Sequence, residues 1–180
     1  MTSRDLSTGN IKEQGNSMTN VVKKYSISYE LAQKMVDEAV AKARELGVSE
    51  NVVILDDGGN LKAFGRMDGA PALCIEMAQN KAYTALIGVS TRDFFDSFKG
   101  DPSLLAGIPT LARMGAWGGG FPIKVNGEIV GSIGLSGAPT VQNDEDCAKA
   151  ALALLPESAS TKSGQSASVD SAYDPIPLAS

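Results

Sequence analysis

The sequence predicts an α+β fold in which helices lie beside a central antiparallel sheet. Two hairpin signals carry this prediction: the turn-forming run Asp56–Asn60 and the pair Asn126-Gly127, each between two short apolar segments. Asn-Gly favours a type I′ turn, because both central residues of that turn need a positive φ. Segments with helical periodicity precede, separate and follow the hairpins. The order is therefore α-β-β-α-(α)-β-β-α, which favours an α+β class over a doubly wound one.

The first predicted helix spans about residues 28–46 and precedes the first hairpin. Ser28 can cap it, because a serine hydroxyl accepts a hydrogen bond from the free N–H groups of the first turn. Apolar residues follow at helical spacing, and Gly47 stands where a helix-terminating glycine is favoured. A short buried strand, Val52–Leu55, and its hairpin partner, Leu61–Met67, come next.

A second helix is predicted over Leu73–Ile87, and one side of it carries small residues. Such a face lets another backbone come close, most simply that of the sheet. These small residues are Cys74, Ala78, Ala82 and Ala85. Ser90 then opens a capping-box pattern for a short helix that ends at Phe98. A loop with at most one helical turn is expected from there to Pro109.

The second hairpin consists of two predicted strands, Phe121–Val125 and Glu128–Ser136, and a last helix follows it. Asn143 is expected to cap this helix. Three acidic residues would then fall in its first turn, where the helix dipole favours them: Asp144, Glu145 and Asp146. The apolar side of the helix consists of Ala148, Ala151, Leu152 and Leu155.

Glycines are concentrated around the second hairpin. The run Gly118–Gly120 precedes it directly, and Gly131 and Gly134 interrupt its returning strand. Glycine weakens a strand unless another group must approach the backbone closely. Two interpretations stay open: a site built from main-chain N–H groups, and tight packing of a helix or a second subunit against the bare sheet.

Composition excludes several classes of function. The chain has no histidine, which rules out Ser-His-Asp and Cys-His nucleophile systems, histidine-bound zinc and the commonest haem ligand. A net charge of -5 without a basic block argues against a nucleic-acid surface. No apolar run approaches membrane-spanning length, and Cys74 and Cys147 form no CxxC pair. We therefore expect no metal site and no nucleic-acid or membrane partner.

A chain of 180 residues is most simply one domain with tails. Residues 1–24 are polar and without periodicity, so a flexible arm is expected there. Residues 156–180 are rich in Ser and Ala, so a disordered tail is expected after a domain that spans residues 25–155. The N-terminal residues contain no apolar signal core, and two separate cysteines suit a reducing compartment. A cytoplasmic location is therefore expected.

Three segments resemble the GlcG/HbpS-like family, which also includes the C-terminal domain of PduO corrinoid adenosyltransferases. They are VVILDDGGNLKAFGRMDGAP, AQNKAYTA and GGGFPIKVNGEIVGSIGLSGAP, within a match that runs from about Ser26 to Leu155. The resemblance implies a profilin-like α-β-α sandwich around an antiparallel sheet, assembled into homo-oligomers. It also implies a small-molecule ligand, since several members bind haem, and it implies no required cofactor.

Three functional interpretations follow from this resemblance. In the first, the chain binds or senses a small organic ligand, with haem among the candidates. Because histidine is missing, an iron ligand would have to come from Tyr83, Met114, Cys74 or Lys81. In the second, the scaffold is a cofactor-free lyase, isomerase or hydratase that acts on a small organic acid or a phenolic compound. In the third, the chain is a structural or regulatory oligomer without a ligand.

The enzyme interpretation names Lys81, Asp68 and Tyr83 as candidate catalytic residues. A lysine, a carboxylate and a phenol can each move a proton once the surroundings adjust its pKa. Lys81 is expected at the surface of a pocket, so that its replacement by alanine would remove function but cost little stability. A purely structural role is the alternative for each of these residues.

The ligand-binding candidates are a second set of residues in or beside the same motifs. An arginine would pair with a substrate carboxylate, and the N–H groups of the glycine run would hold an oxyanion. The aspartate of the first hairpin turn either binds ligand or only shapes the turn. These candidates are Arg66, Arg113, Asp57, Gly118, Gly119 and Gly120. We expect one pocket, bounded by the glycine run, the Lys81 and Tyr83 face, and Arg66 with Asp68.

Overall fold

The computed structural model describes residues 22–155. Residues 1–21 of the expected arm and the whole expected tail, 156–180, lie outside the described residues, and residues 22–24 are exposed without regular secondary structure. None of the described helices is both long and apolar enough to cross a membrane. The elements in chain order are α1 (Tyr29–Glu45), β1 (Asn51–Asp56), β2 (Leu61–Arg66), α2 (Leu73–Ala85), α3 (Thr91–Phe98), α4 (Pro102–Gly107), the 3₁₀ helix η1 (Ile108–Thr110), β3 (Gly120–Val125), β4 (Glu128–Ser136) and α5 (Val141–Leu152).

The four strands of the described part form one antiparallel sheet in the order β2-β1-β4-β3. β1 pairs with β2 on one side and with β4 on the other, and β3 pairs with β4 at the opposite edge. Asn126 (φ 52) and Gly127 (φ 82) both have the positive φ that the predicted type I′ turn requires. The predicted α+β class with an antiparallel sheet is confirmed.

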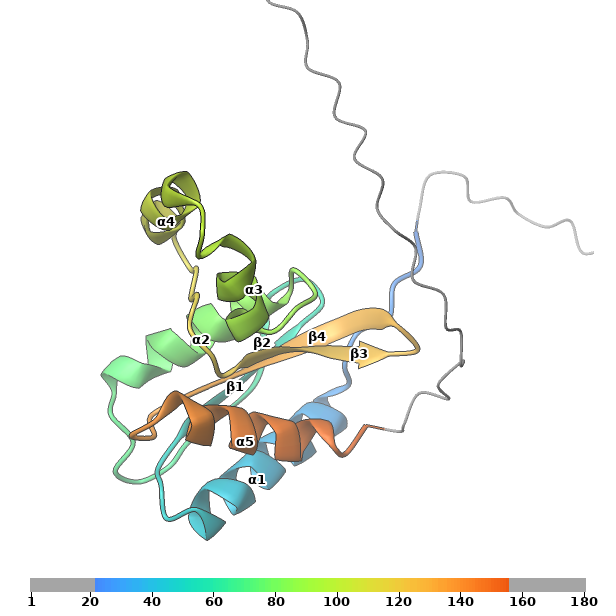
Figure 1. Ribbon diagram of the computed structural model, residues 1–180. Coiled ribbons are helices and arrows are strands. Elements are labelled where there is room, and N and C mark those ends of the chain that lie inside the picture. Colours follow the sequence, from blue (N-terminus) through green and yellow to red (C-terminus); the bar gives the residue numbers. More distant parts are fainter. Residues whose placement is uncertain (1–21, 156–180) are drawn as a thin grey trace, which may run out of the picture.

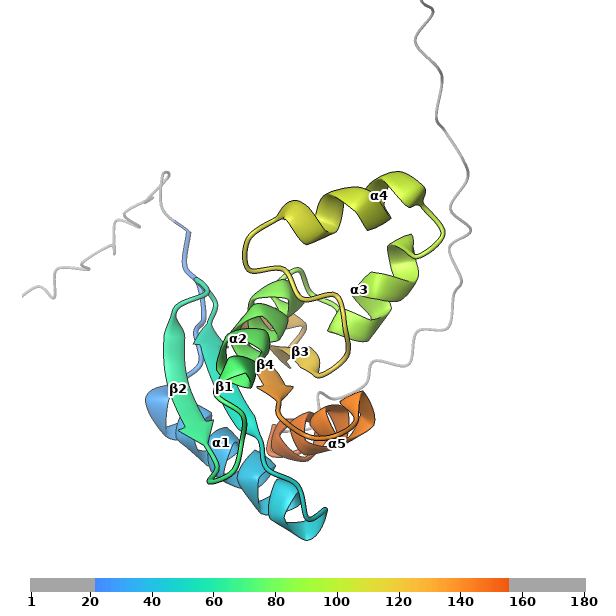
Figure 2. The same ribbon diagram turned by 90° about the vertical axis from the view of Figure 1, so that its left-hand side faces the viewer.

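Helices cover both faces of this sheet and give a sandwich of three layers (Figures 1 and 2). α1 and α5 pack side by side on one face, and α2 lies on the other. Residues alternate along the central strand β1, so Val52 and Ile54 face α1 and α5, whereas Val53 and Leu55 face α2. The profilin-like sandwich that the resemblance implied is the observed arrangement.

α2 packs very close to the sheet because both surfaces carry small side chains. Ala78 and Ala82 are fully buried on the helix, and Gly134 lies opposite them on β4. A Cβ at Gly134 would lie 2.5 Å from the Ala82 nitrogen and would overlap the Ala78 carbonyl. Tight helix packing therefore accounts for Gly134, the second of the two interpretations of the strand glycines.

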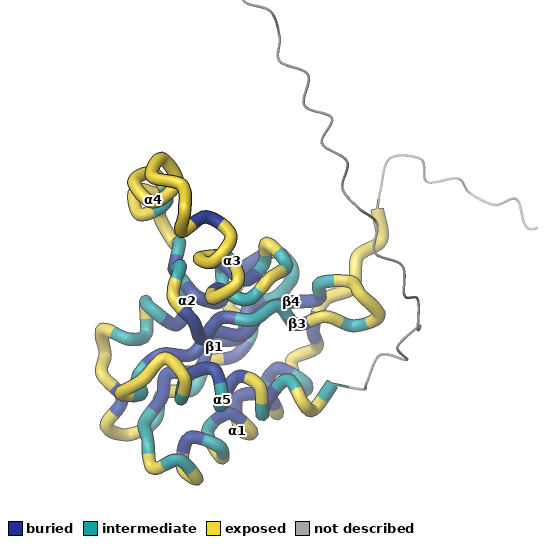
Figure 3. The backbone as a smooth tube through the Cα atoms, viewed as in Figure 1, coloured by how far each residue is buried: buried dark blue, intermediate teal, exposed yellow. Residues whose placement is uncertain are grey.

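α3, α4 and η1 form an arm beside α2 that projects from the sandwich (Figures 1 and 2). Ser90 caps α3 as predicted, since its hydroxyl accepts from the Asp93 N–H. More helix forms after α3 than the single turn expected, because Asp101 caps α4 and Pro102 occupies its first position. No residue of α4 is buried, as its exposed colour in Figure 3 shows.

α5 begins earlier than the sequence indicated. Its N-cap is Thr140, whose hydroxyl accepts from the Asn143 N–H at 3.2 Å, so the prediction that Asn143 caps the helix is wrong. The earlier start leaves Asn143 inside the first turn and brings the next two residues further into the helix. Asp144 and Glu145 are consequently buried rather than solvated at a helix end.

Candidate functional site

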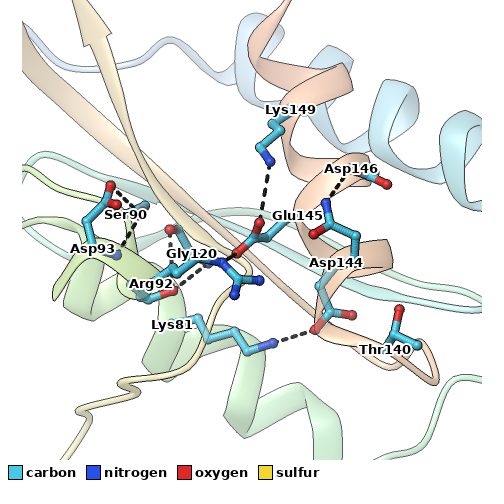
Figure 4. Close-up of polar contacts among 12 residues, drawn as sticks. Lys81, Ser90, Arg92, Asp93, Gly120, Thr140, Asp144, Glu145, Asp146 and Lys149 are labelled. Atoms are coloured by element: carbon cyan, nitrogen blue, oxygen red, sulfur yellow. Dashed lines mark hydrogen bonds and ion pairs between the residues drawn. The ribbon is translucent and has the colours of Figure 1, made fainter. Parts of the chain in front are cut away.

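The centre of the candidate site is Lys81, in the middle of α2. Its side chain is 1% exposed, and its Nζ donates to Asp144 Oδ2 at 2.5 Å (Figure 4). The same Nζ donates to the Leu135 carbonyl at 2.7 Å. The expectation that Lys81 lies at a surface is therefore wrong. The cause is the close packing of α2 on the sheet, which directs this face of the helix toward β4 and the start of α5.

A second buried carboxyl group, that of Glu50, lies beside this ion pair, from the residue just before β1. When both groups are ionised, the two carboxyl oxygens of Glu50 and Asp144 Oδ1 are buried without a partner among the described residues. A proton on Glu50 supplies a hydrogen bond between the two carboxyl groups. Burial first, and then the neighbouring Asp144 carboxylate, raise the pKa of Glu50 to about 9. Glu50 is therefore protonated at neutral pH. We call Glu50, Asp144 and Lys81 the buried cluster: it holds one neutral acid, one anion and one cation.

Two glycines border the buried cluster with main chain alone. A Cβ at Gly119 (φ +111) would lie 2.9 Å from Lys81 Nζ, and a Cβ at Gly137 (φ +150) would lie 3.4 Å from Glu50 Oε2. Both φ values lie in the region that favours glycine. At these two positions the backbone packs directly against the buried cluster and leaves no room for a side chain.

A second ion pair lies one residue further along α5. Glu145 is buried, and its Oε1 accepts from Arg92 Nε of α3 at 2.6 Å, while Lys149 Nζ lies 3.4 Å from Oε2 (Figure 4). The Arg92 side chain is half exposed. Only its Nε contacts an acidic group among the described residues, so the outer edge of the guanidinium is available to an anion.

A surface hollow of about 370 Å³ lies beside these charges, between α3, the glycine run and the start of α5. Its volume falls in the range of small-molecule sites, roughly 300–1,000 Å³. It combines the Arg92 cation with aromatic walls, including Trp117, the single tryptophan of the chain. We call it the Trp117 hollow; its lining residues are Arg92, Phe95, Asp96, Ala116, Trp117, Gly118 and Val141.

The structure brings the predicted glycine run and Lys81 together. Gly118 lines the Trp117 hollow, and Gly119 borders the Lys81 ammonium. The Gly120 N–H donates to Thr91 Oγ1 at 3.0 Å, so this group is occupied within the fold. The part of the glycine run that faces a ligand-sized space is therefore its first residue.

Tyr83 and Arg113 lie apart from Lys81 and form a contact of their own. The Arg113 guanidinium carbon lies 3.9 Å from the centre of the Tyr83 ring, and Arg113 Nη2 donates to the Gly59 carbonyl at 3.3 Å. Tyr83 is two residues from Lys81 on α2, a spacing that turns the two side chains to different sides of the helix. This pair connects the end of the arm to the β1–β2 turn.

The remaining predicted residues lie elsewhere on the surface. Arg66 Nε donates to the Ala70 carbonyl at 3.1 Å, and Arg66 and Asp68 line another hollow, of about 400 Å³, together with residues of α1. Asp57 lines a third hollow with the segment 23–25 that precedes α1. The structure therefore does not assemble Arg66, Asp68 and Asp57 with the glycine run.

Several residues in or beside the candidate site were not predicted from the sequence: Glu50, Arg92, Trp117, Asp144 and Glu145. One signal was available for Asp144. It stands four residues before Ala148 and seven before Ala151, so it shares the apolar stripe of α5 and was bound to be buried. Glu50 and Arg92 gave no such signal, because their partners are distant in the sequence.

Comparison with known proteins places these features in a family. An uncharacterised 15.0 kDa protein from the dhaT-dhaS intergenic region of Citrobacter freundii is 34% identical over 134 residues, which cover 73% of this chain and 94% of that protein. Protein GlcG of Escherichia coli K12 is 31% identical over 114 residues, 63% of this chain and 83% of that protein.

Two solved structures share the fold. The protein ORFY of Klebsiella pneumoniae has a TM-score of 0.71 at 30% identity, over 76% of this chain and 94% of that one. PduOC, crystallised as a complex with haem, has a TM-score of 0.65 at 28% identity, over 71% of this chain and 94% of that one. The family model described as haem degrading protein HbpS-like matches residues 27–153. The resemblance drawn from the sequence is confirmed: this chain belongs to the HbpS-like family.

Proposed function

We propose that this protein binds a flat, carboxylate-bearing small molecule in the Trp117 hollow, and that haem is among the molecules it takes. The observation that carries the proposal is the combination, in one hollow, of a half-exposed guanidinium and exposed aromatic side chains. The haem complex of PduOC supports the choice of haem as a probe.

The lining of the Trp117 hollow is suited to such a molecule. Arg92 already makes a bond of 2.6 Å from Nε to Glu145, which fixes its position, and its Nη groups can bind a ligand carboxylate. Trp117 and Phe95 are 38% and 39% exposed, so each offers a ring face or edge to a planar ligand. The charge and the aromatic groups together would orient the ligand with its carboxylate toward α3 and α5.

None of the iron-ligand candidates named from the sequence lies in this hollow. The chain has no histidine, and none of the four alternatives lines the Trp117 hollow: Tyr83, Met114, Cys74 and Lys81. Lys81 is committed to Asp144, and Tyr83 is covered by Arg113. The proposal therefore has haem held by its carboxylates and its ring faces, with no iron ligand from the hollow's own side chains.

Trp117 makes the proposal directly testable, because a ligand in the hollow must change the fluorescence of the only tryptophan. We expect haemin and metal-free protoporphyrin IX to quench it with dissociation constants within a few-fold of each other. Arg92→Gln should lower the affinity for both compounds by about tenfold or more, since a hydrogen bond to a charged group contributes roughly 1.5–3 kcal/mol. Lys149→Ala, which removes an exposed cation nearby, is the matched control and should bind as the unmodified chain does.

Two results would count against this proposal. Quenching by neither compound would show that the Trp117 hollow does not bind the ligand class. Binding of haemin with no binding of protoporphyrin IX would show that iron coordination, and not the carboxylate contact, provides the affinity.

The second candidate function, a cofactor-free lyase, isomerase or hydratase, is favoured by one observation, the buried cluster beside the hollow. A buried ammonium beside two carboxyl groups that share one proton is the kind of cluster that moves protons in enzymes. A homo-oligomer also remains part of the proposal, supported by exposed apolar residues on the α3–α4 arm.

A further inference from the structure

We propose that Glu50 and Asp144 form a proton-transfer site that acts on a small oxo acid whose carboxylate is bound by Arg92. Lys81 is the residue that positions the pair. This inference rests on the proposed function, since it uses the Trp117 hollow as the place where the substrate is held. It goes further by naming the reaction type, the substrate class and the two catalytic groups.

The geometry of the pair is the first support. Glu50 precedes β1 and Asp144 belongs to α5, yet both side chains reach the same interior position beside Lys81. Three carboxyl oxygens of this pair are buried and lack a partner among the described residues when both groups are ionised, and a proton on Glu50 supplies a hydrogen bond between the two groups. Buried polar atoms are nearly always satisfied in proteins, so the pair is arranged to hold one proton between two carboxyl groups.

The charge balance is the second support. Lys81 supplies one positive charge, which compensates one carboxylate but not two. The pair of carboxyl groups therefore keeps one proton between them, with Glu50 as the protonated member, in agreement with its pKa of about 9. The buried thiol of Cys147, whose pKa burial and these carboxylates raise to about 12, adds no charge. An acid and a base thus stand side by side at neutral pH.

The step conserves atoms and charge without any co-reactant. Asp144 takes a proton from the carbon next to the substrate carbonyl, and the electron pair of that C–H bond forms the carbon–carbon double bond of an enol. The carbonyl oxygen receives the proton of Glu50. The carboxyl pair then still holds one proton, now on Asp144, so the net charge of the buried cluster does not change. The reverse step returns a proton to carbon.

Access requires the main chain between the hollow and the pair to move. Gly118 lines the hollow, and Gly119 borders Lys81, so the two sites are separated by consecutive glycines. Gly119 carries no side chain, but its carbonyl accepts from the Leu135 N–H at 2.9 Å, so this hydrogen bond must open for the segment to move. A shift of this backbone segment would place a bound oxo acid against Asp144.

The test is deuterium exchange into phenylpyruvate, an aromatic oxo acid with exchangeable protons next to its carbonyl. The protein is incubated with phenylpyruvate in deuterated buffer, the loss of the methylene signal is followed by proton NMR, and binding is measured separately by Trp117 fluorescence. We expect the unmodified protein to exceed the buffer rate. Asp144→Asn and Glu50→Gln should each lose about 100-fold or more of this excess, the usual contribution of a positioned acid or base. Lys149→Ala should keep the full rate.

The outcomes separate this inference from the proposed function. Binding of phenylpyruvate without exchange above buffer overturns the proton-transfer site and leaves the binding function standing. Exchange that survives in both Asp144→Asn and Glu50→Gln also overturns it. A further readout guards against variants that only unfold: in the unmodified protein, exchange should fall as pH rises through about 9, where Glu50 loses its proton. An exchange rate that shows no such fall contradicts the acid role of Glu50.

Discussion

Lys81 stabilises the protein only together with its carboxylate partner. A buried ammonium is tolerated when its charge and its protons are matched, and here Asp144 and the Leu135 carbonyl match them. The same pair is weak evidence of net stability, because both charges lost their water on folding. Removing only one partner of the pair is destabilising, because the other charge would then remain in the interior without compensation.

Lys81→Ala is therefore expected to destabilise the fold by about 3–5 kcal/mol, because Asp144 and Glu50 would remain buried without a cation. Urea unfolding at neutral pH measures this change. Lys149→Ala, at an exposed lysine of α5, is the control and should change the free energy of unfolding by no more than about 0.5 kcal/mol. A decrease of less than about 1 kcal/mol in the free energy of unfolding of Lys81→Ala would show that water enters the interior or that Asp144 takes up a proton.

Glu50→Gln is expected to stabilise the protein, and increasingly so as pH rises. The pKa of Glu50 is about 9 in the fold against an ordinary value of 4.5, so between these values the folded state binds one more proton than the unfolded state. The contribution of Glu50 to the free energy of unfolding is therefore largest below pH 4.5 and declines as pH rises through about 9. Glutamine cannot ionise, so the variant avoids this decline. At neutral pH the decline in the free energy of unfolding amounts to up to about 3 kcal/mol relative to acidic pH.

Denaturant unfolding of both proteins across this pH range checks the Glu50 prediction. The two stability curves should meet near the acidic end and separate toward pH 9. Parallel curves, with a difference that does not depend on pH, would mean that Glu50 is ionised in the fold.

At the scale of elements, the close-packed interface between α2 and β4, which we call the seam, determines where the site residues lie. Ala78, Ala82 and Gly134 let the two backbones approach, and this approach directs Lys81 into the interior. The sequence predicted the small face of α2 and its packing against the sheet. It did not show that the same seam buries a lysine, because the partner of Lys81 stands 63 residues away on α5.

Gly134→Ala is expected to disrupt this seam. The added methyl group would overlap the Ala78 carbonyl, and backbone cannot move aside as a flexible side chain can, so the cost is about 1–3 kcal/mol or more. Gly100→Ala is the matched control, because a Cβ there meets nothing within 4 Å. Thermal unfolding should show a lower midpoint for Gly134→Ala alone. Equal midpoints for the two variants would mean that α2 and β4 are less closely packed than described.

Local rules explain why most elements were predictable and why the site was not. Asn126-Gly127, Ser28 and Ser90 each act within a few residues, and each fulfils its predicted role. The prediction for Asn143 failed because Thr140, three residues earlier, is also a favoured N-cap residue and starts the helix sooner. The site depends on contacts between α2, α3 and α5, and no local pattern encodes that Arg92 meets Glu145.

At the scale of the whole molecule, residues 22–155 leave an apolar surface uncovered on the α3–α4 arm. α4 has no buried residue, and large apolar side chains of the arm are exposed, among them Phe95, Leu104, Leu105 and Leu111. We expect the protein to self-associate through this surface, because stable homo-oligomers bury large apolar areas. Light scattering should give a mass above that of the 18.7 kDa chain, and replacement of both Leu104 and Leu105 by aspartate should lower it. A monomer mass for the unmodified protein at micromolar concentration would contradict this.

The central claim, that the Trp117 hollow is the ligand site, is tested most directly by NMR mapping. Metal-free protoporphyrin IX is titrated into ¹⁵N-labelled protein, and amide and side-chain N–H shifts are followed. The largest changes are expected at the Trp117 indole N–H, the Gly118 amide and Arg92 Nε, with the β1–β2 turn around Gly59 unchanged. Changes centred on Gly59 and Arg113, with Trp117 and Gly118 unaffected, would contradict it.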